Sequence, residues 1–374
     1  MEPKTALTIR EARTGLMARS IRGQSSDASR GRQSLAELLK EARIWDAAFT
    51  EQPVLPGDLS FTQGGLRIAG EVVPLSGVAC KKLITQAKAP AWYFAKRSAQ
   101  LRAVALQEHL NEGAFGQRPC VIRNQGSVAT IARGELVDLS FSEVLGATLE
   151  VSEQRGEPLF VARIGVEEQR IEVELVSATQ VMDVRPGDVI QAGVEIIHER
   201  YGSVPTQIHS FVYRLVCSNG QTRKECGANK DLTRARRLPV TMPNARELQM
   251  DEIRRLVRQT LQGMGQQMEE LRRSAERPAD VPELLLRWLQ RARISPRAMM
   301  PRLLEAWLRE GSEATQFGAI NALTRVGTHD TSLSDRQRRV LSALGGLLAF
   351  SHVHICPRCF SVLGSGSDES EDAA

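Results

Sequence analysis

The stretch that most constrains the fold of this 374-residue chain is residues 187–226, where strand and turn signals are densest. Residues 189–197 and 207–217 are rich in β-branched and aromatic side chains, which are typical of strands. A turn at residues 202–205 separates them. Arg185-Pro-Gly-Asp188 supplies another turn, because proline fixes φ and glycine accepts a positive φ. The pattern predicts an antiparallel hairpin, and no phosphate-loop or Gly-x-Gly-x-x-Gly pattern follows any strand.

The segments around this hairpin predict further strands and a helical second half. Upstream, β-branched or alternating runs predict strands at residues 66–69, 120–123, 127–131, 160–164 and 171–175. Helices are predicted at 34–45 and 142–151, and the helical pattern of 76–110 is divided into two helices by a break at Pro90. Downstream, helical spacing predicts helices at residues 247–275, 281–292, 297–310, 314–325 and 334–350. The expected fold class is α+β: an antiparallel sheet with flanking helices, followed by an all-helical C-terminal region.

Composition shifts divide the chain into four parts. Residues 1–33 are basic and polar with weak periodicity, so we expect a mobile arm. Residues 34–240 form the α+β domain, and residues 241–350 form the helical region packed on it. Residues 351–374 hold a Cys-x-x-Cys motif and an acidic tail that we expect to be disordered.

Charge is unevenly distributed along the chain. The net charge is only +5, but residues 1–34 hold seven Lys or Arg against three acids, and residues 223–246 hold seven against two. The tail at 368–372 is acidic. Segregated charge favours a polyanion partner, although a simply solvated arginine-rich surface has the same pattern. The candidate phosphate-contacting residues are Arg223, Lys224, Lys230, Arg234, Arg236 and Arg237.

The C-terminal end carries the one motif with metal-ligand spacing. Cys356 and Cys359 can share a tetrahedral Zn²⁺ at about 2.3 Å, and His352 or His354 can add a third ligand. An unmetallated pair and a redox dithiol remain open alternatives. Six cysteines in a chain of this length do not form a disulfide framework, and the N-terminal region lacks the apolar run of a secretory signal. We therefore expect a cytoplasmic protein without membrane spans.

Three patches of the sequence resemble one protein family. They are Val184-Arg-Pro-Gly-Asp188 through Phe211-Val-Tyr-Arg-Leu-Val-Cys-Ser-Asn-Gly220, then Gln316-Phe-Gly-Ala-Ile-Asn-Ala-Leu-Thr-Arg325 followed by a helix with Gly345-Gly346, and the helical stretch 79–110. These patches are similar to the phage- and plasmid-related family of the domain of unknown function nine-thirty-two, across roughly residues 35–350. The segment at 128–135 departs from that family's more regular pattern, and the Cys-x-x-Cys end looks like an addition. The resemblance implies a mobile-element setting close to DNA recombination, with no reaction assigned.

Three functional hypotheses follow from the sequence. The first is a non-catalytic, oligomeric accessory protein that binds nucleic acid, in particular single-stranded DNA, through the basic loop and the N-terminal arm. The second is an assembly module in which the 247–275 stripe and the zinc end hold subunits, and the acidic tail recruits a protein partner. The third is a metal-dependent nuclease, with carboxylates such as Glu172, Glu174 and Glu195 on the sheet.

Overall fold

The fold is described from a computed structural model. It covers residues 33–86, 94, 96–116, 119–132, 134–167, 169–201, 204–214, 222–223, 234–350, 352–353 and 362–363. Antiparallel sheets combine with helices that are concentrated in the C-terminal half, so the predicted α+β class is confirmed. The predicted arm, apart from Gln33, and the acidic tail lie outside the described residues.

The centre of the molecule is a six-stranded antiparallel sheet in the order β11-β10-β9-β8-β7, with β12 also pairing with β10. Its strands are β7 (Leu159–Glu167), β8 (Arg170–Arg185), β9 (Asp188–Glu199), β10 (Thr206–Arg214), β11 (Thr222–Arg223) and β12 (Arg234–Ala235). β9 and β10 form the predicted hairpin, with Gln207 opposite Ile197. The predicted turn before β9 is present as well, with Gly187 at a φ of 81°. We call this six-stranded unit the central sheet.

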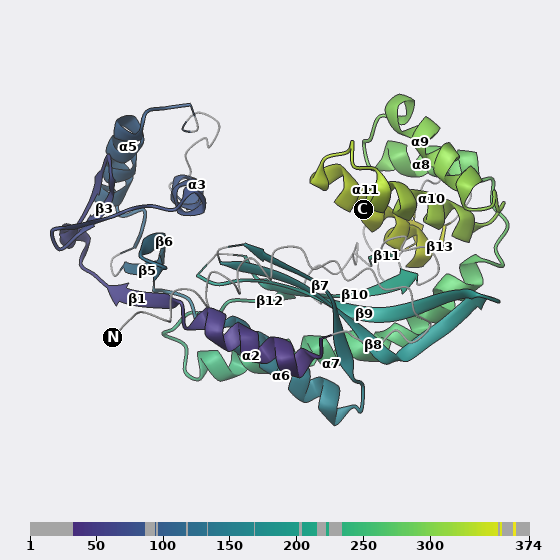
Figure 1. The fold of residues 1–374 in the computed structure, drawn as a ribbon, viewed down its shortest axis with the longest axis horizontal. Helices are drawn as coiled ribbons and strands as arrows, with labels where there is room; N and C mark the ends of the chain where they lie inside the picture. The colour runs from purple at the N-terminus through teal and green to yellow at the C-terminus, as the bar shows by residue number, and fades with distance from the viewer. Residues whose placement is uncertain are drawn as a thin grey trace, which may run out of the picture.

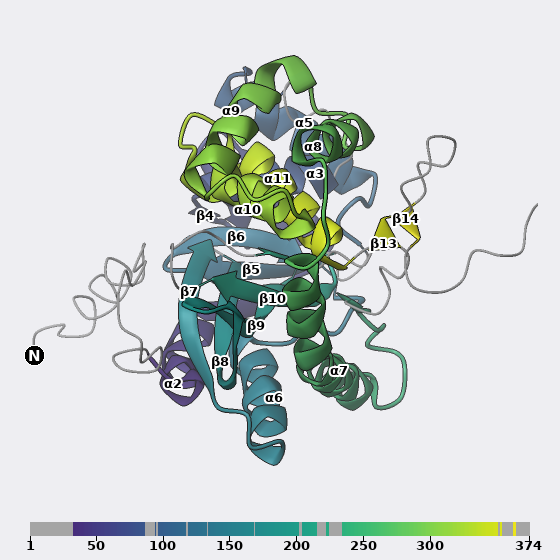
Figure 2. The same ribbon diagram turned by 90° about the vertical axis from the view of Figure 1, so that its right-hand side faces the viewer.

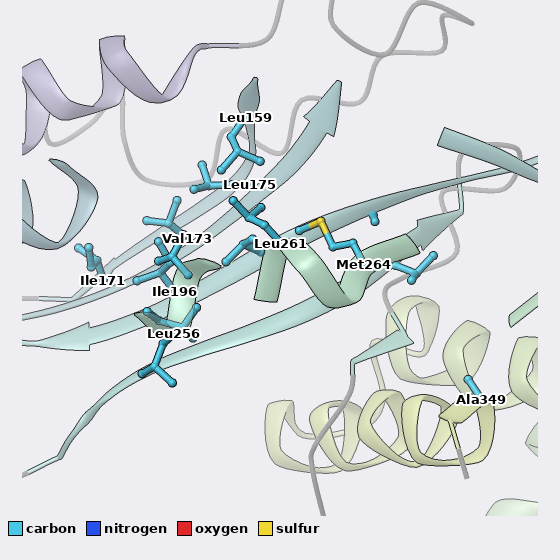
Figure 3. Close-up of a cluster of buried hydrophobic side chains, with 14 of the residues drawn as sticks. Leu159, Ile171, Val173, Leu175, Ile196, Leu256, Leu261, Met264 and Ala349 are labelled. Carbon is cyan, nitrogen blue, oxygen red and sulfur yellow. The ribbon is translucent and has the colours of Figure 1, made fainter. Parts of the chain in front are cut away.

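One face of the central sheet is covered by three helices, α2 (Leu35–Asp46), α6 (Phe141–Gln154) and α7 (Ala245–Ser274) (Figure 1). Strand side chains alternate between the two faces, and those on the covered face are apolar. They include Ile171, Val173, Leu175, Ala192, Val194 and Ile196. The apolar stripe of α7 packs on them, and Figure 3 shows Leu261 and Met264 of α7 beside the strands. The stripe predicted at 247–275 therefore contacts the chain's own sheet.

Residues 49–132 form a smaller N-terminal lobe with its own core. Its elements are β1 (Phe49–Pro53), η1 (Pro56–Asp58), β2 (Leu59–Thr62), β3 (Gly65–Ile68), β4 (Glu71–Val73), α3 (Gly77–Gln86), α5 (Ala99–Asn111), β5 (Cys120–Asn124) and β6 (Ser127–Ala132). One cluster of buried residues, from Leu59 to Ile131, is separate from the core of the central sheet. Phe94 is buried in this lobe core. Trp92 and Tyr93, which precede it, lie outside the described residues.

The C-terminal helices stand at the other end of the central sheet. They are α8 (Val281–Arg291), α9 (Pro296–Arg309), α10 (Gln316–His329) and α11 (Asp335–Phe350), followed by the short strands β13 (His352–Val353) and β14 (Val362–Leu363). α10 is buried on nearly all sides. Figure 1 shows these helices and the N-terminal lobe rising from opposite ends of the sheet, on the side away from α2, α6 and α7.

Candidate functional site

The basic segment predicted from the sequence follows the outer edge of β10. β11 pairs with the C-terminal part of β10, where Arg223 is opposite Phe211, and β12 pairs with its N-terminal part, where Arg234 is opposite Gln207. Phe211 and Gln207 are four residues apart on one strand, so Arg223 and Arg234 occupy positions of the same parity, about 13 Å apart along the edge. Lys224 and Lys230 lie outside the described residues.

Two arginines of this edge are open to solvent. Arg234 and Arg236 are both exposed. Arg236 lies near α7, where its positive charge acts on Glu252. The pKa of Glu252 is below its ordinary value, chiefly because Arg255 donates hydrogen bonds to it and to a smaller degree because of Arg236. The exposed cations here are therefore Arg234 in β12 and Arg236 beside α7, where Arg255 is already paired with Glu252.

Arg237 differs from its two neighbours because its side chain is only 5% exposed. Its guanidinium donates to the carbonyl oxygens of Val204 and Glu199 and lies 3.5 Å from a carboxylate oxygen of Asp138. These three contacts tie the end of the basic segment to the hairpin between β9 and β10. Arg237 is thus an anchor, and its guanidinium has no open side for a phosphate.

The anchor belongs to a buried polar network built around Arg200. The Arg200 guanidinium lies 3.1 Å from Asp138 and 3.2 Å from Asp46. Asp46 also accepts the backbone N–H groups of Phe141 and Ser142, at 2.9 and 2.8 Å, at the first turn of α6. A carboxylate is stabilised there by the helix dipole and the unpaired N–H groups. The network fixes α2, α6 and the β9–β10 hairpin relative to one another.

Tyr201 completes this network toward the N-terminal lobe. Its hydroxyl donates a hydrogen bond to Glu51 of β1 at 2.7 Å and accepts one from the Arg200 guanidinium. Burial raises the pKa of the Tyr201 phenol well above its ordinary value, so the hydroxyl keeps its proton at neutral pH. This arrangement stabilises the fold rather than activating a nucleophile.

The N-terminal half of α7 adds arginines that the sequence analysis did not select. Arg246 pairs with Glu143 at 2.5 Å, Arg254 with Glu150 at 2.8 Å, and Arg255 with Glu252 at 2.5 Å. Arg258 is exposed and has no ion-pair partner within the described residues. The prediction for this helix rests on its apolar stripe alone. The sequence feature that indicates a basic surface as well is the run of arginines at 254, 255 and 258 on the outward face.

A surface hollow of about 380 Å³ lies between α6 and α7. It is lined by Glu143, Arg246, Glu247, Met250, Asp251 and Arg254. Burial alone would raise the pKa of Glu143, but hydrogen bonds from the Ser140 backbone and from Arg246 bring it below its ordinary value. The hollow is therefore lined by acidic and basic side chains that pair with one another. This gives it no strong preference for an anion or a cation.

The second face of the central sheet carries a row of titratable side chains. The register places Glu174 opposite Glu195, and Glu195 opposite His209. All three residues are less than 8% exposed, and Arg163 lies 3.3 Å from Glu174. In the described part of the chain, no group of three His, Cys, Asp or Glu side chains has the geometry to hold a metal ion. The predicted nuclease site therefore gains no support from the geometry.

The predicted zinc ligands fall mostly beyond what the structure describes. Cys356, Cys359 and His354 lie outside the described residues, and His352 is placed only by its backbone, opposite Leu363 in the β13–β14 pair. In the sequence, both cysteines fall between these two strands. Zinc binding stays a prediction.

Comparison with known proteins adds no relative: no family model, no curated protein and no solved structure matches this chain. Within the described residues, no helix is both long and apolar enough to span a membrane.

Proposed function

We propose that this protein binds nucleic acid, with single-stranded DNA as the preferred form, through the cationic edge formed by β11, β12 and the outward face of α7. The observation that supports this most directly is the exposure of Arg234 in β12 and of Arg236 just after it, in a segment anchored by the buried Arg237 side chain. Anchoring fixes the backbone that carries both arginines, so less backbone entropy is lost when they contact phosphates. Arg258 is a further exposed arginine on α7, the helix that packs against β12.

The mode of binding is electrostatic and independent of sequence. Lys and Arg side chains that neutralise phosphates release counterions, and the affinity then falls linearly with the logarithm of salt concentration. A polar edge without base-reading geometry suits an accessory role in DNA metabolism, in agreement with the resemblance to phage- and plasmid-related proteins. The proposal also includes a phage- or plasmid-related setting, a cytoplasmic location and a non-catalytic role.

The test is fluorescence anisotropy with labelled single- and double-stranded oligonucleotides across a salt series. The double charge reversal Arg234→Glu with Arg236→Glu should weaken binding to all sequences alike. If both residues contact phosphates of a single strand, the slope of log affinity against log salt should fall by about 1.4.

The matched control is Lys40→Glu with Arg43→Glu. It makes the same change in net charge at two exposed positions on α2, away from the cationic edge. If the two double variants lose affinity equally, binding depends on net charge alone and the proposed edge is wrong. If the wild type does not bind at low salt, the assembly hypothesis takes precedence.

A further inference from the structure

β7 is the outermost strand of the central sheet, and among the described residues most of its outer edge has no pairing strand (Figure 2). Within the part of the chain that the structure describes, its first residues have a partner on that side. Ser34 bridges Phe160, and the N–H of Val161 donates to the carbonyl oxygen of Gln33 at 2.9 Å. No strand within the described residues pairs with positions 163–167 on their outer side. An open strand edge offers unpaired N–H and C=O groups to another strand.

The pairing of β7 with β8 determines which of these backbone groups point outward. Val161 donates outward, and a bulge between Val161 and Arg163 then shifts the alternation by one residue. At the far end, Glu167 pairs with Arg170 across a two-residue connection, so its groups face β8. Because orientation alternates along the strand, Arg163 and Gly165 also face β8. Ile164 and Val166 therefore direct their N–H and C=O groups to the open edge.

We propose that β7 pairs with β7 of a second copy of this chain, antiparallel and centred on Gly165. With this centre, Ile164 of one copy is opposite Val166 of the other, and the pair exchanges two hydrogen bonds. The two-fold axis generates the same pair again, so all four outward N–H groups and their carbonyl acceptors are used. Antiparallel registers shifted by two residues in either direction leave part of this set unpaired. The two central sheets then become one continuous sheet.

The same register makes the charges self-complementary. Arg163 of one copy stands opposite Glu167 of the other, and the axis repeats the pair at the far end. The Arg163 side chain is 64% exposed, so it is accessible for this contact while it remains near Glu174. On the other side of the strand, the half-buried Ile164 and Val166 give an apolar cross-strand pair. An unrelated peptide would have no reason to match both patterns, which is why a second copy is the occupant.

The proposal does not depend on nucleic-acid binding, and it is tested by sedimentation velocity of the full chain over a concentration series. The wild type should sediment as a dimer at high concentration. Arg163→Glu places like charges opposite each other twice, so the dimer dissociation constant should rise about tenfold or more. Arg163→Glu combined with Glu167→Arg restores complementarity and should recover the dimer. Ile164→Pro removes an outward N–H only, so it should abolish the dimer and keep the fold.

Arg309→Glu is the control. It makes the same change of charge on α9, where the exposed Arg309 pairs with Glu305, outside β7 and its neighbour β8, and should leave the dimer intact. A wild type that stays monomeric throughout the series overturns the proposal, including the case in which the chain's own N-terminal residues occupy the edge. A dimer that survives both Arg163→Glu and Ile164→Pro overturns it as well. Circular dichroism of each variant confirms that loss of the dimer is not loss of the fold.

Discussion

At the scale of single residues, His198 shows how the core of the central sheet fixes a protonation state. The ring is fully buried, its Nε2–H donates to the carbonyl oxygen of Leu139 at 2.9 Å, and its Nδ1 lies 2.8 Å from the hydroxyl oxygen of Thr206. Burial, followed by the positive charge of Arg237, lowers the pKa of His198 from 6.5 to about 3. The imidazole is therefore neutral in the folded protein at any physiological pH.

This difference in pKa predicts how stability depends on pH. Between pH 6.5 and pH 3 the unfolded chain binds a proton at His198 and the folded protein does not, so the free energy of unfolding falls as the pH falls through this range. From pH 7.5 to pH 5.5 the wild type should lose about 1.4 kcal/mol of unfolding free energy through this residue. In the His198→Gln variant, the loss of unfolding free energy over the same pH range should be smaller by that amount. Urea unfolding of both proteins at the two pH values measures the difference, and equal losses would contradict the assignment.

The contrast between Arg237 and Arg234 gives a second prediction at this scale. Arg237→Ala removes a buried guanidinium from Asp138 and from two carbonyl oxygens, so the free energy of unfolding should fall by about 3 kcal/mol. Arg234→Ala changes an exposed side chain and should alter it by no more than about 0.5 kcal/mol. Chemical denaturation measures both. A mild effect of Arg237→Ala would mean that the residue is not the anchor of the basic segment.

At the scale of elements, α10 and α11 pack through glycines. A Cβ on Gly327 would meet the Ser342 hydroxyl oxygen at 2.6 Å, and a Cβ on Gly345 would meet a Thr324 methyl carbon at 2.7 Å. Gly327→Ala should therefore destabilise the protein by about 1–3 kcal/mol through overpacking. Gly263→Ala in α7 is the control, because its Cβ would have 3.8 Å to the nearest atom and should gain up to about 1 kcal/mol from helix propensity. Thermal unfolding of the two variants should shift in opposite directions.

Local signals account for the elements that the sequence predicted well. A capping box at Ser34 begins α2, close to the predicted start at residue 34. Ser334 and Gln337 exchange capping hydrogen bonds before α11, and the β9–β10 hairpin follows its turn residues. β1 was missed because it is a short polar strand whose pairing partner, β5, is far along the chain. Nothing near β1 in the sequence specifies that pairing.

The candidate site was predictable only as a region. The run of basic residues indicated the correct edge of the sheet, but Arg234, Arg236 and Arg237 are the same residue type within four positions. Which of them is buried depends on Asp138 and Glu199, which the fold brings together from distant segments. Position in the sequence therefore could not separate the anchor from the exposed arginines.

At the scale of the whole molecule, the N-terminal lobe is attached to the central sheet partly through polar contacts. Lys82 of α3 lies 2.7 Å from a carboxylate oxygen of Glu199 and 2.5 Å from the side-chain oxygen of Gln169. Gln169 in turn donates to the carbonyl oxygen of Ala129 in the lobe at 2.5 Å. Burial lowers the pKa of Lys82, and the charge of Glu199 offsets part of that shift. Because the lobe has its own core, loss of this joint should loosen its attachment without unfolding it.

Lys82→Met tests that expectation, since it leaves the half-buried Glu199 and the buried Gln169 without their cation. Hydrogen exchange should become faster in residues 77–86 of α3 and around Gln169, because local opening there no longer breaks an ion pair. Exchange in the lobe core at residues 59–68 should stay slow. Lys40→Met, at an exposed position on α2, should change neither region. Uniformly faster exchange across the protein would show instead that the joint supports global stability and that the lobe and the central sheet unfold as one cooperative unit.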